Sequence, residues 1–179
     1  MQMNNDLNET IFCFDSSALI ILHKFYGTDI LHEIWEELEA LFSNGRILSH
    51  ILVFDELTTN ARKPDDLSRW ISQKRQYFKN MTGVQAQYVA SIIEEFPRLI
   101  DPNHEKNQAD PWLIAQILED RSQPQLGFFG SNREFIVVSE ESEKSPQKIP
   151  AVCKRYDIQH FSLKEFFKFN GWTLRLEKA

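Results

Sequence analysis

Short apolar segments that alternate with amphipathic helical segments restrict the fold of this chain more than any other feature. Four segments have the length and composition of buried strands: residues 11–15, 46–48, 135–138 and 158–161. Helices are predicted over residues 16–23, 28–42, 50–60, 64–78, 82–96 and 150–156, from Asp110 onward, and after Ser162. Strands separated by helices pair in parallel. The sequence therefore predicts an α/β fold, a three-layer α/β/α arrangement with a short central parallel sheet.

The chain length favours one domain over two. At 179 residues, with 42% hydrophobic and 26% charged residues, the composition excludes disorder over most of the chain. We expect a single domain over residues 1–179, with frayed tails at 1–9 and 173–179. No apolar run approaches the roughly 20 residues of a membrane helix, and the polar N-terminus does not resemble a signal peptide. Two cysteines are too few for a disulfide framework, so we expect a cytoplasmic protein without a membrane partner.

Charge is unevenly distributed along the chain. The net charge of −6 argues against nucleic-acid binding by bulk electrostatics alone. From Lys144 to the C-terminus, however, eight basic residues stand against three acidic ones, and a second basic cluster spans residues 62–79. These clusters have two interpretations, namely solvated helix faces or a surface that contacts nucleic acid.

Acidic residues lie where the predicted strands end or the predicted helices begin. Asp15 ends the first strand, Glu140 and Glu141 follow the third, Asp110 begins a helix, and Glu56 lies in an otherwise apolar helix. Ligands gather at the carboxyl ends of parallel strands. Carboxylates brought together there repel one another unless a cation neutralises them. Hard oxygen ligands of this kind suit Mg²⁺ or Mn²⁺, which serve phosphodiester chemistry.

Each of these acids also has a purely structural interpretation. Asp15 and Asp110 could simply cap the helices that follow them. Glu56 could reach solvent while its neighbour Asp55 points inward, and Glu140 and Glu141 could be solvated loop residues. The functional interpretation depends on the four positions taken together.

The order of these motifs resembles the PIN-domain superfamily, in particular a PIN-like branch of small prokaryotic proteins related to VapC-type toxins. The resemblance spans roughly residues 11–172 and rests on four motifs: Phe14-Asp15-Ser16-Ser17-Ala18-Leu19-Ile20, Val53-Phe54-Asp55-Glu56-Leu57, Ala109-Asp110-Pro111-Trp112-Leu113-Ile114-Ala115 and Val137-Val138-Ser139-Glu140-Glu141. Two departures are evident. Glu141 stands where many members have Asp, and the interval between the third and fourth acids is long, which a loop over residues 122–133 would explain.

The resemblance implies a metal-dependent ribonuclease that hydrolyses RNA phosphodiester bonds. It implies that the catalytic and metal-binding acids are Asp15, Glu56, Asp110 and Glu141, with Mg²⁺ or Mn²⁺ as cofactor. It further implies supporting roles for the hydroxyls of Ser17 and Ser139. By the same resemblance the protein is the toxin of a toxin–antitoxin pair, with an RNA substrate, a protein antitoxin and a homodimer as partners.

Two other functions are also consistent with the sequence. The chain could be a non-catalytic PIN-like binding module, or a structure-specific DNA nuclease that uses the same acids. No phosphate-cradling glycine loop or zinc-protease histidine pair is present in the sequence. Four tryptophans on apolar helix faces are predicted to be core residues, and Cys13 and Cys153 to be buried thiols.

Overall fold

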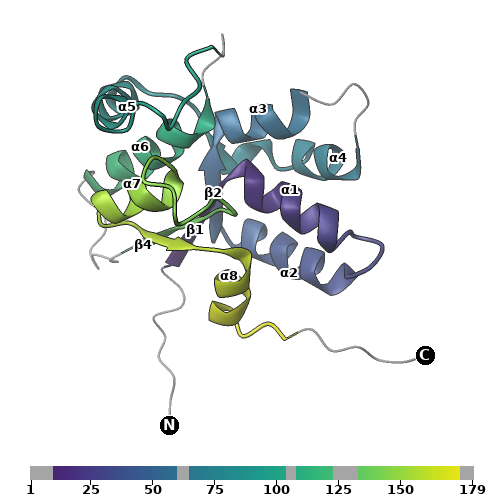
Figure 1. The fold of residues 1–179 in the computed structure, drawn as a ribbon. Coiled ribbons are helices and arrows are strands. Elements are labelled where there is room, and N and C mark those ends of the chain that lie inside the picture. The colour runs from purple at the N-terminus through teal and green to yellow at the C-terminus, as the bar shows by residue number, and fades with distance from the viewer. Residues whose placement is uncertain (1–9, 60–64, 104–107, 123–132, 174–179) are drawn as a thin grey trace, which may run out of the picture.

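A parallel sheet forms the centre of the molecule (Figure 1). The computed structural model of the chain describes residues 10–59, 65–103, 108–122 and 133–173. Five strands pair in the order β3-β2-β1-β4-β5, and each pair is parallel. Their bounds are β1 Thr10–Phe14, β2 Ile47–His50, β3 Phe78–Lys79, β4 Glu134–Val138 and β5 Gln159–Phe161.

Helices cover both faces of this sheet. In Figure 1, α5, α6 and α7 lie on one side of the sheet, and α1, α2, α3, α4 and α8 lie on the other. The α-helices of the described chain are α1 Ser16–Phe25, α2 His32–Ser43, α3 Ile51–Thr59, α4 Asp66–Ser72, α5 Gly83–Glu95, α6 Ala109–Ser122, α7 Ile149–Arg155 and α8 Leu163–Phe169. The predicted three-layer α/β/α fold with a central parallel sheet, which is the architecture that the resemblance to PIN domains implies, is confirmed.

Strand β1 lies in the middle of the sheet and feeds two separate cores. Phe12 and Phe14 belong to the core under α1, α2, α3 and α8, whereas Ile11 and Cys13 belong to the core under α5, α6 and α7. This division follows from the alternation of side chains along a strand. Because both faces are covered, β1 reads as a continuous apolar run and ends only at the charged Asp15.

Phe166 fastens α8 to the sheet. Its ring is fully buried and meets the rings of Phe12 and Phe14 edge to face, at centroid distances of 4.8 and 5.0 Å. Such pairs contribute beyond simple burial because the ring edge is electropositive and the ring face electronegative. The capping box predicted at Ser162 and Glu165 is present and fixes the start of this helix.

Three boundaries differ from the sequence prediction. The helix predicted to run to residue 78 ends at Ser72, and Phe78 lies instead in β3, a strand that the sequence did not indicate. The helix predicted from residue 28 begins at His32, because the backbone N–H groups of Ile30 and Leu31 bond to Gly27 in a turn. Helix α6 begins at Ala109, so Asp110 lies inside its first turn and is not its cap.

Other expectations fall partly within the described chain. Cys13 and Cys153 are free and buried, as predicted. Of the four tryptophans, Trp35 is buried, and Trp70, Trp112 and Trp172 are partly buried against the two cores. Residues 1–9, 174–179 and most of the loop predicted over 122–133 lie outside the described residues. No described helix is long and apolar enough to cross a membrane.

Replacement of Phe166 tests the packing of α8. We expect Phe166→Ala to lower the free energy of unfolding by about 3 to 5 kcal/mol, because it leaves a cavity between β1 and α8. Phe25→Ala is the matched control, because the Phe25 side chain is 58% exposed and its loss should change stability by about 0.5 kcal/mol or less. Urea unfolding measures both variants. Equal effects of the two substitutions would contradict the packing described.

Candidate active site

The predicted acids lie at the point where the strand order reverses. Strand β1 pairs with β2 on one side and β4 on the other, and open parallel sheets bind ligands beside the carboxyl ends of such strands. Asp15 directly follows β1, and its backbone N–H donates to the carbonyl of Val138, the last residue of β4, at 2.9 Å. The segment after β4 carries Glu141. The sheet topology therefore brings the first and last motifs together.

Asp15 is held through one of its two carboxylate oxygens. Its Oδ2 accepts hydrogen bonds from the backbone N–H of Ser17 at 3.0 Å and from the Ser17 hydroxyl at 2.5 Å. Asp15 thus caps α1, and Ser17 contacts it as predicted. The side chain is 3% exposed, and Oδ1 is buried with no hydrogen-bond partner in the described structure. An unpartnered buried carboxylate oxygen is costly unless a ligand completes it.

Glu56 is held through both oxygens. The hydroxyl of Ser16 donates to Oε2 at 2.7 Å, and the backbone N–H of Ala109 donates to Oε1 at 3.2 Å. Glu56 thus joins α1, α3 and α6. Its neighbour Asp55 is exposed, so the structure places Glu56, not Asp55, among the acids.

Glu141 is also held through both oxygens. The backbone N–H of Ile149 donates to Oε2 at 2.9 Å, and Lys148 Nζ forms an ion pair with Oε1 at 2.9 Å. The hydrogen bond with Glu141 is the main cause that raises the pKa of Lys148, and the negative charges of Asp110 and Asp15 raise it further. A lysine of the protein therefore neutralises part of the acidic cluster.

Asp110 is the acid with the fewest hydrogen bonds from the described residues. Its carboxylate receives no hydrogen bond from the described residues, and the structural interpretation of Asp110 as a helix cap is wrong. Burial, and then the negative charges of Asp15, Glu141 and Glu56, raise its pKa to about 8. Burial raises the pKa of Asp15 to about 6 against the opposing hydrogen bonds of Ser17, with Glu56 and Glu141 adding to the rise. The four predicted acids thus share one electrostatic environment.

The donor set fits a divalent cation, although the acids do not yet converge on one point. Among the described residues, no three acidic, histidine or cysteine side chains form a ready metal-binding group. Both oxygens of Glu56 and both oxygens of Glu141 are engaged by other groups of the protein. Asp15 Oδ1 and the Asp110 carboxylate remain available, and hard oxygens that repel one another are the donors that Mg²⁺ and Mn²⁺ take.

The remaining motif residues face elsewhere. The hydroxyl of Ser139, predicted to support the acids, contacts His160 Nε2 at 2.8 Å instead. Glu140 is exposed, and its carboxylate accepts the backbone N–H of Leu163 at 2.6 Å, which ties the loop to α8. Between Glu140 and Glu141, the structure therefore places Glu141 in the acidic cluster.

Two contributors to the site were not predicted. Ser16 holds Glu56, and its place beside Asp15 in the first motif was the available signal. Lys148 lies in a polar loop, and no local pattern in the sequence connects it to Glu141.

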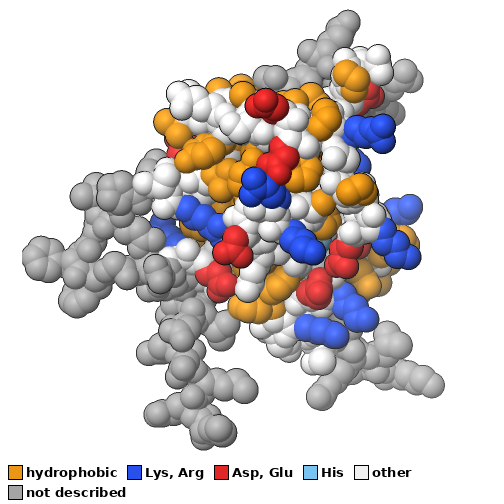
Figure 2. All heavy atoms as spheres, turned by 60° about the vertical axis from the view of Figure 1, so that its left-hand side comes forward, with side chains coloured by type: hydrophobic (Ala, Val, Ile, Leu, Met, Phe, Trp, Pro, Cys, Tyr) orange, Lys and Arg blue, Asp and Glu red, His pale blue; other side chains and the backbone are white. Residues whose placement is uncertain are grey.

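Three of the four described basic residues in the cluster around residues 62–79 form ion pairs, and the fourth, Arg75, hydrogen-bonds to the neutral side chain of Asn80. Residues 62 and 63 lie outside the described part, and the other members are paired: Arg69 with Asp66, Lys74 with Glu39, Arg75 with Asn80 and Lys79 with Asp120. On the face drawn in Figure 2, positive and negative side chains are likewise interspersed. For these residues the interpretation as ordinary helix-face charges is favoured over a nucleic-acid surface.

Fold and site together define an α/β protein with a cluster of carboxylates at the switch point of a parallel sheet. The chain belongs to the family described as "Domain of unknown function (DUF4411)", which matches residues 12–174. No curated protein matches it. A crystal structure of VapBC2 from Rickettsia felis, bound to a DNA fragment from their promoter, is similar at 12% identity and a TM-score of 0.49, covering 85% of this chain and 98% of that chain. A likeness at this level does not bear on function.

The raised pKa values predict how stability depends on pH. Asp110 binds a proton more tightly in the folded chain than in the unfolded chain, so deprotonation costs stability as pH rises from about 4 to 8. In EDTA we expect Asp110→Asn to be more stable than the wild type by about 1 to 3 kcal/mol at pH 8, with little difference at pH 4. Urea unfolding across this range measures the effect.

Asp55→Asn is the matched control for this experiment, because Asp55 is exposed on α3 outside the cluster. It should follow the wild-type pH dependence. If Asp110→Asn also followed the wild-type curve, the raised pKa of Asp110 in the folded chain would be refuted.

Proposed function

We propose that this protein is a metal-dependent nuclease that hydrolyses RNA phosphodiester bonds. The observation that carries the proposal is the pair of Asp15 and Asp110, whose free oxygens and mutual repulsion call for a cation at the switch point of the sheet. When bound, Mg²⁺ or Mn²⁺ would supply the positive charge that stabilises the phosphate oxygens and makes water more acidic.

Some side chains of the cluster are proposed to bind the metal ion, and others orient these ligands. Asp15 Oδ1 and Asp110 are the groups proposed to hold the ion, because the described structure leaves both without hydrogen-bond donors. Ser17 fixes the orientation of Asp15, and Ser16 and the Ala109 N–H fix Glu56. Glu56 and Glu141 are proposed as further ligands or as the groups that orient the attacking water.

Lys148 provides a positive charge of the protein itself at the candidate site. The Lys148 side chain is 41% exposed and its ammonium forms an ion pair with Glu141, so it can also meet an anionic substrate that approaches from solvent. A phosphodiester that enters the site therefore meets one positive charge of the protein beside the acids. This arrangement reduces the repulsion between an acidic site and an anionic backbone.

The substrate and the partners are proposed from the motif resemblance to VapC-type PIN domains. On that resemblance we propose that RNA is the substrate, that the protein is the toxin of a toxin–antitoxin pair, and that an antitoxin and a homodimer are its partners. A structure-specific DNA nuclease would use the same four acids and differ only in substrate.

One observation favours the second candidate, a non-catalytic binding module. Both glutamates are already satisfied by groups of the protein, so the cluster is stable in part without an ion. A binding module needs no metal. Metal dependence therefore separates the two functions.

Cleavage of RNA tests the proposal. We expect purified wild-type protein to cleave mixed cellular RNA in Mn²⁺ and not in EDTA. Asp15→Asn should lower the rate by about a hundredfold or more, because it removes a charged ligand. Gel electrophoresis of the RNA and of a single-stranded DNA of equal length gives the rate and the substrate preference.

Asp55→Asn again serves as the control and should cleave like the wild type. A folded wild-type protein that neither cleaves nucleic acid nor binds Mn²⁺ would refute the nuclease and leave the binding module.

A further inference from the structure

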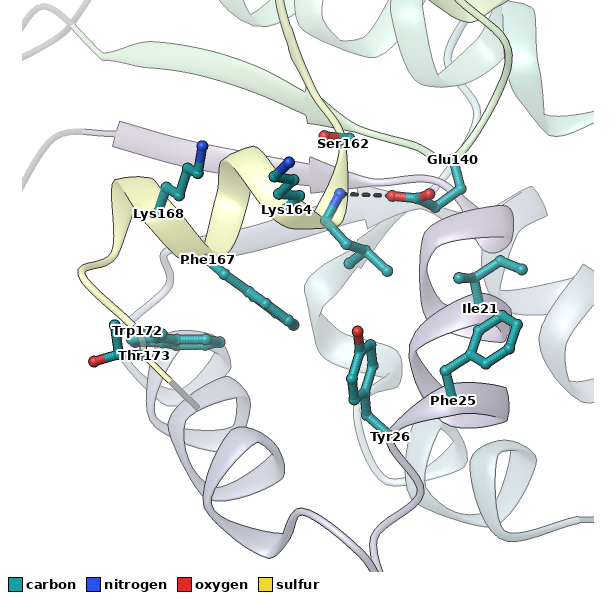
Figure 3. Close-up of a pocket in the computed structure, with 11 residues that line it drawn as sticks. Ile21, Phe25, Tyr26, Glu140, Ser162, Lys164, Phe167, Lys168, Trp172 and Thr173 are labelled. Atoms are coloured by element: carbon teal, nitrogen blue, oxygen red, sulfur yellow. Dashed lines mark hydrogen bonds between the residues drawn. The ribbon is translucent and has the colours of Figure 1, made fainter. Parts of the chain in front are cut away.

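An apolar groove opens between α1 and α8, beside the candidate active site (Figure 3). Its volume is about 720 Å³. Eleven residues line it: Ile21, Phe25, Tyr26, Glu140, Ser162, Leu163, Lys164, Phe167, Lys168, Trp172 and Thr173.

Aromatic rings form much of the groove wall. Phe25 is 58% exposed, and Tyr26, Phe167 and Trp172 are partly exposed. Figure 3 shows the ring of Phe167 between those of Tyr26 and Trp172, at centroid distances of 6.1 and 5.6 Å. Exposed rings on a groove are stacking platforms for planar ligands such as nucleobases.

Positive charges surround these rings. Lys164 and Lys168 line the groove from α8, and neither forms an ion pair within the described chain. Lys24 Nζ lies 5.3 Å from the ring centroid of Phe25. The one carboxylate in the wall, that of Glu140, is engaged by the N–H of Leu163. These lysines contrast with the paired basic residues around β3.

The groove lies next to the acidic cluster. The backbone N–H of Glu140, a groove residue, donates to the Ser17 hydroxyl at 3.1 Å, and that hydroxyl donates to Asp15. Helix α1 starts beside Asp15 and carries Phe25 at its far end, roughly 15 Å away at 1.5 Å per residue. A polymer held at Asp15 can therefore extend along the groove.

We propose that this groove binds single-stranded RNA on one side of the scissile bond. Bases stack on the exposed aromatic rings, and Lys164 and Lys168 contact the phosphates between them. This inference rests on the proposed nuclease function and extends it to a substrate class. Single-stranded RNA fits because its bases are exposed, whereas a duplex keeps them stacked on one another. An apolar segment of a partner protein would offer no ion-pair partner to Lys164 and Lys168.

Fluorescence anisotropy with a fluorescein-labelled 12-nucleotide single-stranded RNA tests the proposal, in EDTA and 50 mM salt so that no cleavage occurs. Phe25→Leu keeps the position apolar but removes the ring, and we expect about tenfold weaker binding. Circular dichroism confirms that the variant folds. Duplex RNA of the same sequence should bind more weakly and should not respond to Phe25→Leu.

The lysines are tested by the salt dependence of the same binding. Lys168→Gln should reduce the slope of log K against log salt by about 0.7, the value for one phosphate contact on a single strand. Lys154→Gln, an exposed lysine on α7 with the same loss of charge, should leave the slope unchanged.

Three results would overturn the assignment of the groove to RNA. The first two are no RNA binding by the wild type and equal binding by Phe25→Leu. The third is a wild-type dimer in light scattering that Phe25→Leu dissociates, because this result would assign the groove to a second copy of the chain.

Failure of the proposed nuclease function gives different results. RNA binding that responds to Phe25→Leu without any Mn²⁺-dependent cleavage would support the groove and refute the nuclease. Cleavage with an unchanged KM in Phe25→Leu would support the nuclease and refute the groove.

Discussion

Repulsion between the buried carboxylates of Asp15, at the end of β1, and Asp110, in the first turn of α6, is the constraint on which the rest of the site depends. Asp15 and Asp110 are drawn together by the sheet topology and α6, and burial makes their charged forms costly. The surrounding hydrogen bonds and one ion pair offset part of this electrostatic cost. Two serine hydroxyls, three backbone N–H groups of α1, α6 and α7, and one lysine hold three of the four acids. Asp110 and one oxygen of Asp15 are left without a hydrogen-bond donor in the described structure.

The central position of β1 explains why the site and the groove are neighbours. Its alternate side chains enter both cores, so the strand is fixed on both faces and its carboxyl end is well placed for a rigid site. The same strand, through Phe12 and Phe14, packs on Phe166 and sets α8 opposite α1. The groove between these helices and the acids are thus neighbours because both are positioned by one strand.

Much of this could be predicted from the sequence, for identifiable reasons. The strands β1, β2, β4 and β5 were predicted from short apolar segments, and the start of α8 from the capping box at Ser162 and Glu165; these predictions were confirmed. Strand β3 was missed because it has two residues and follows a 3₁₀ turn, so its apolar Phe78 was consistent with a helix. The pairing of Lys148 with Glu141 and the contact of Ser139 with His160 depend on tertiary proximity, which no local pattern encodes. The catalytic roles of the acids stay predictions.

The central claim is that Asp15 and Asp110 bind a divalent cation, which displaces the proton that Asp110 retains at neutral pH. Titration calorimetry of Mn²⁺ binding at pH 7, in buffers of different ionisation enthalpy, counts the protons released per ion. Because the pKa of Asp15 is about 6 and that of Asp110 about 8, we expect release of roughly one proton per Mn²⁺, chiefly from Asp110. Saturable binding with no proton release, or no binding at all by the folded protein, would contradict it.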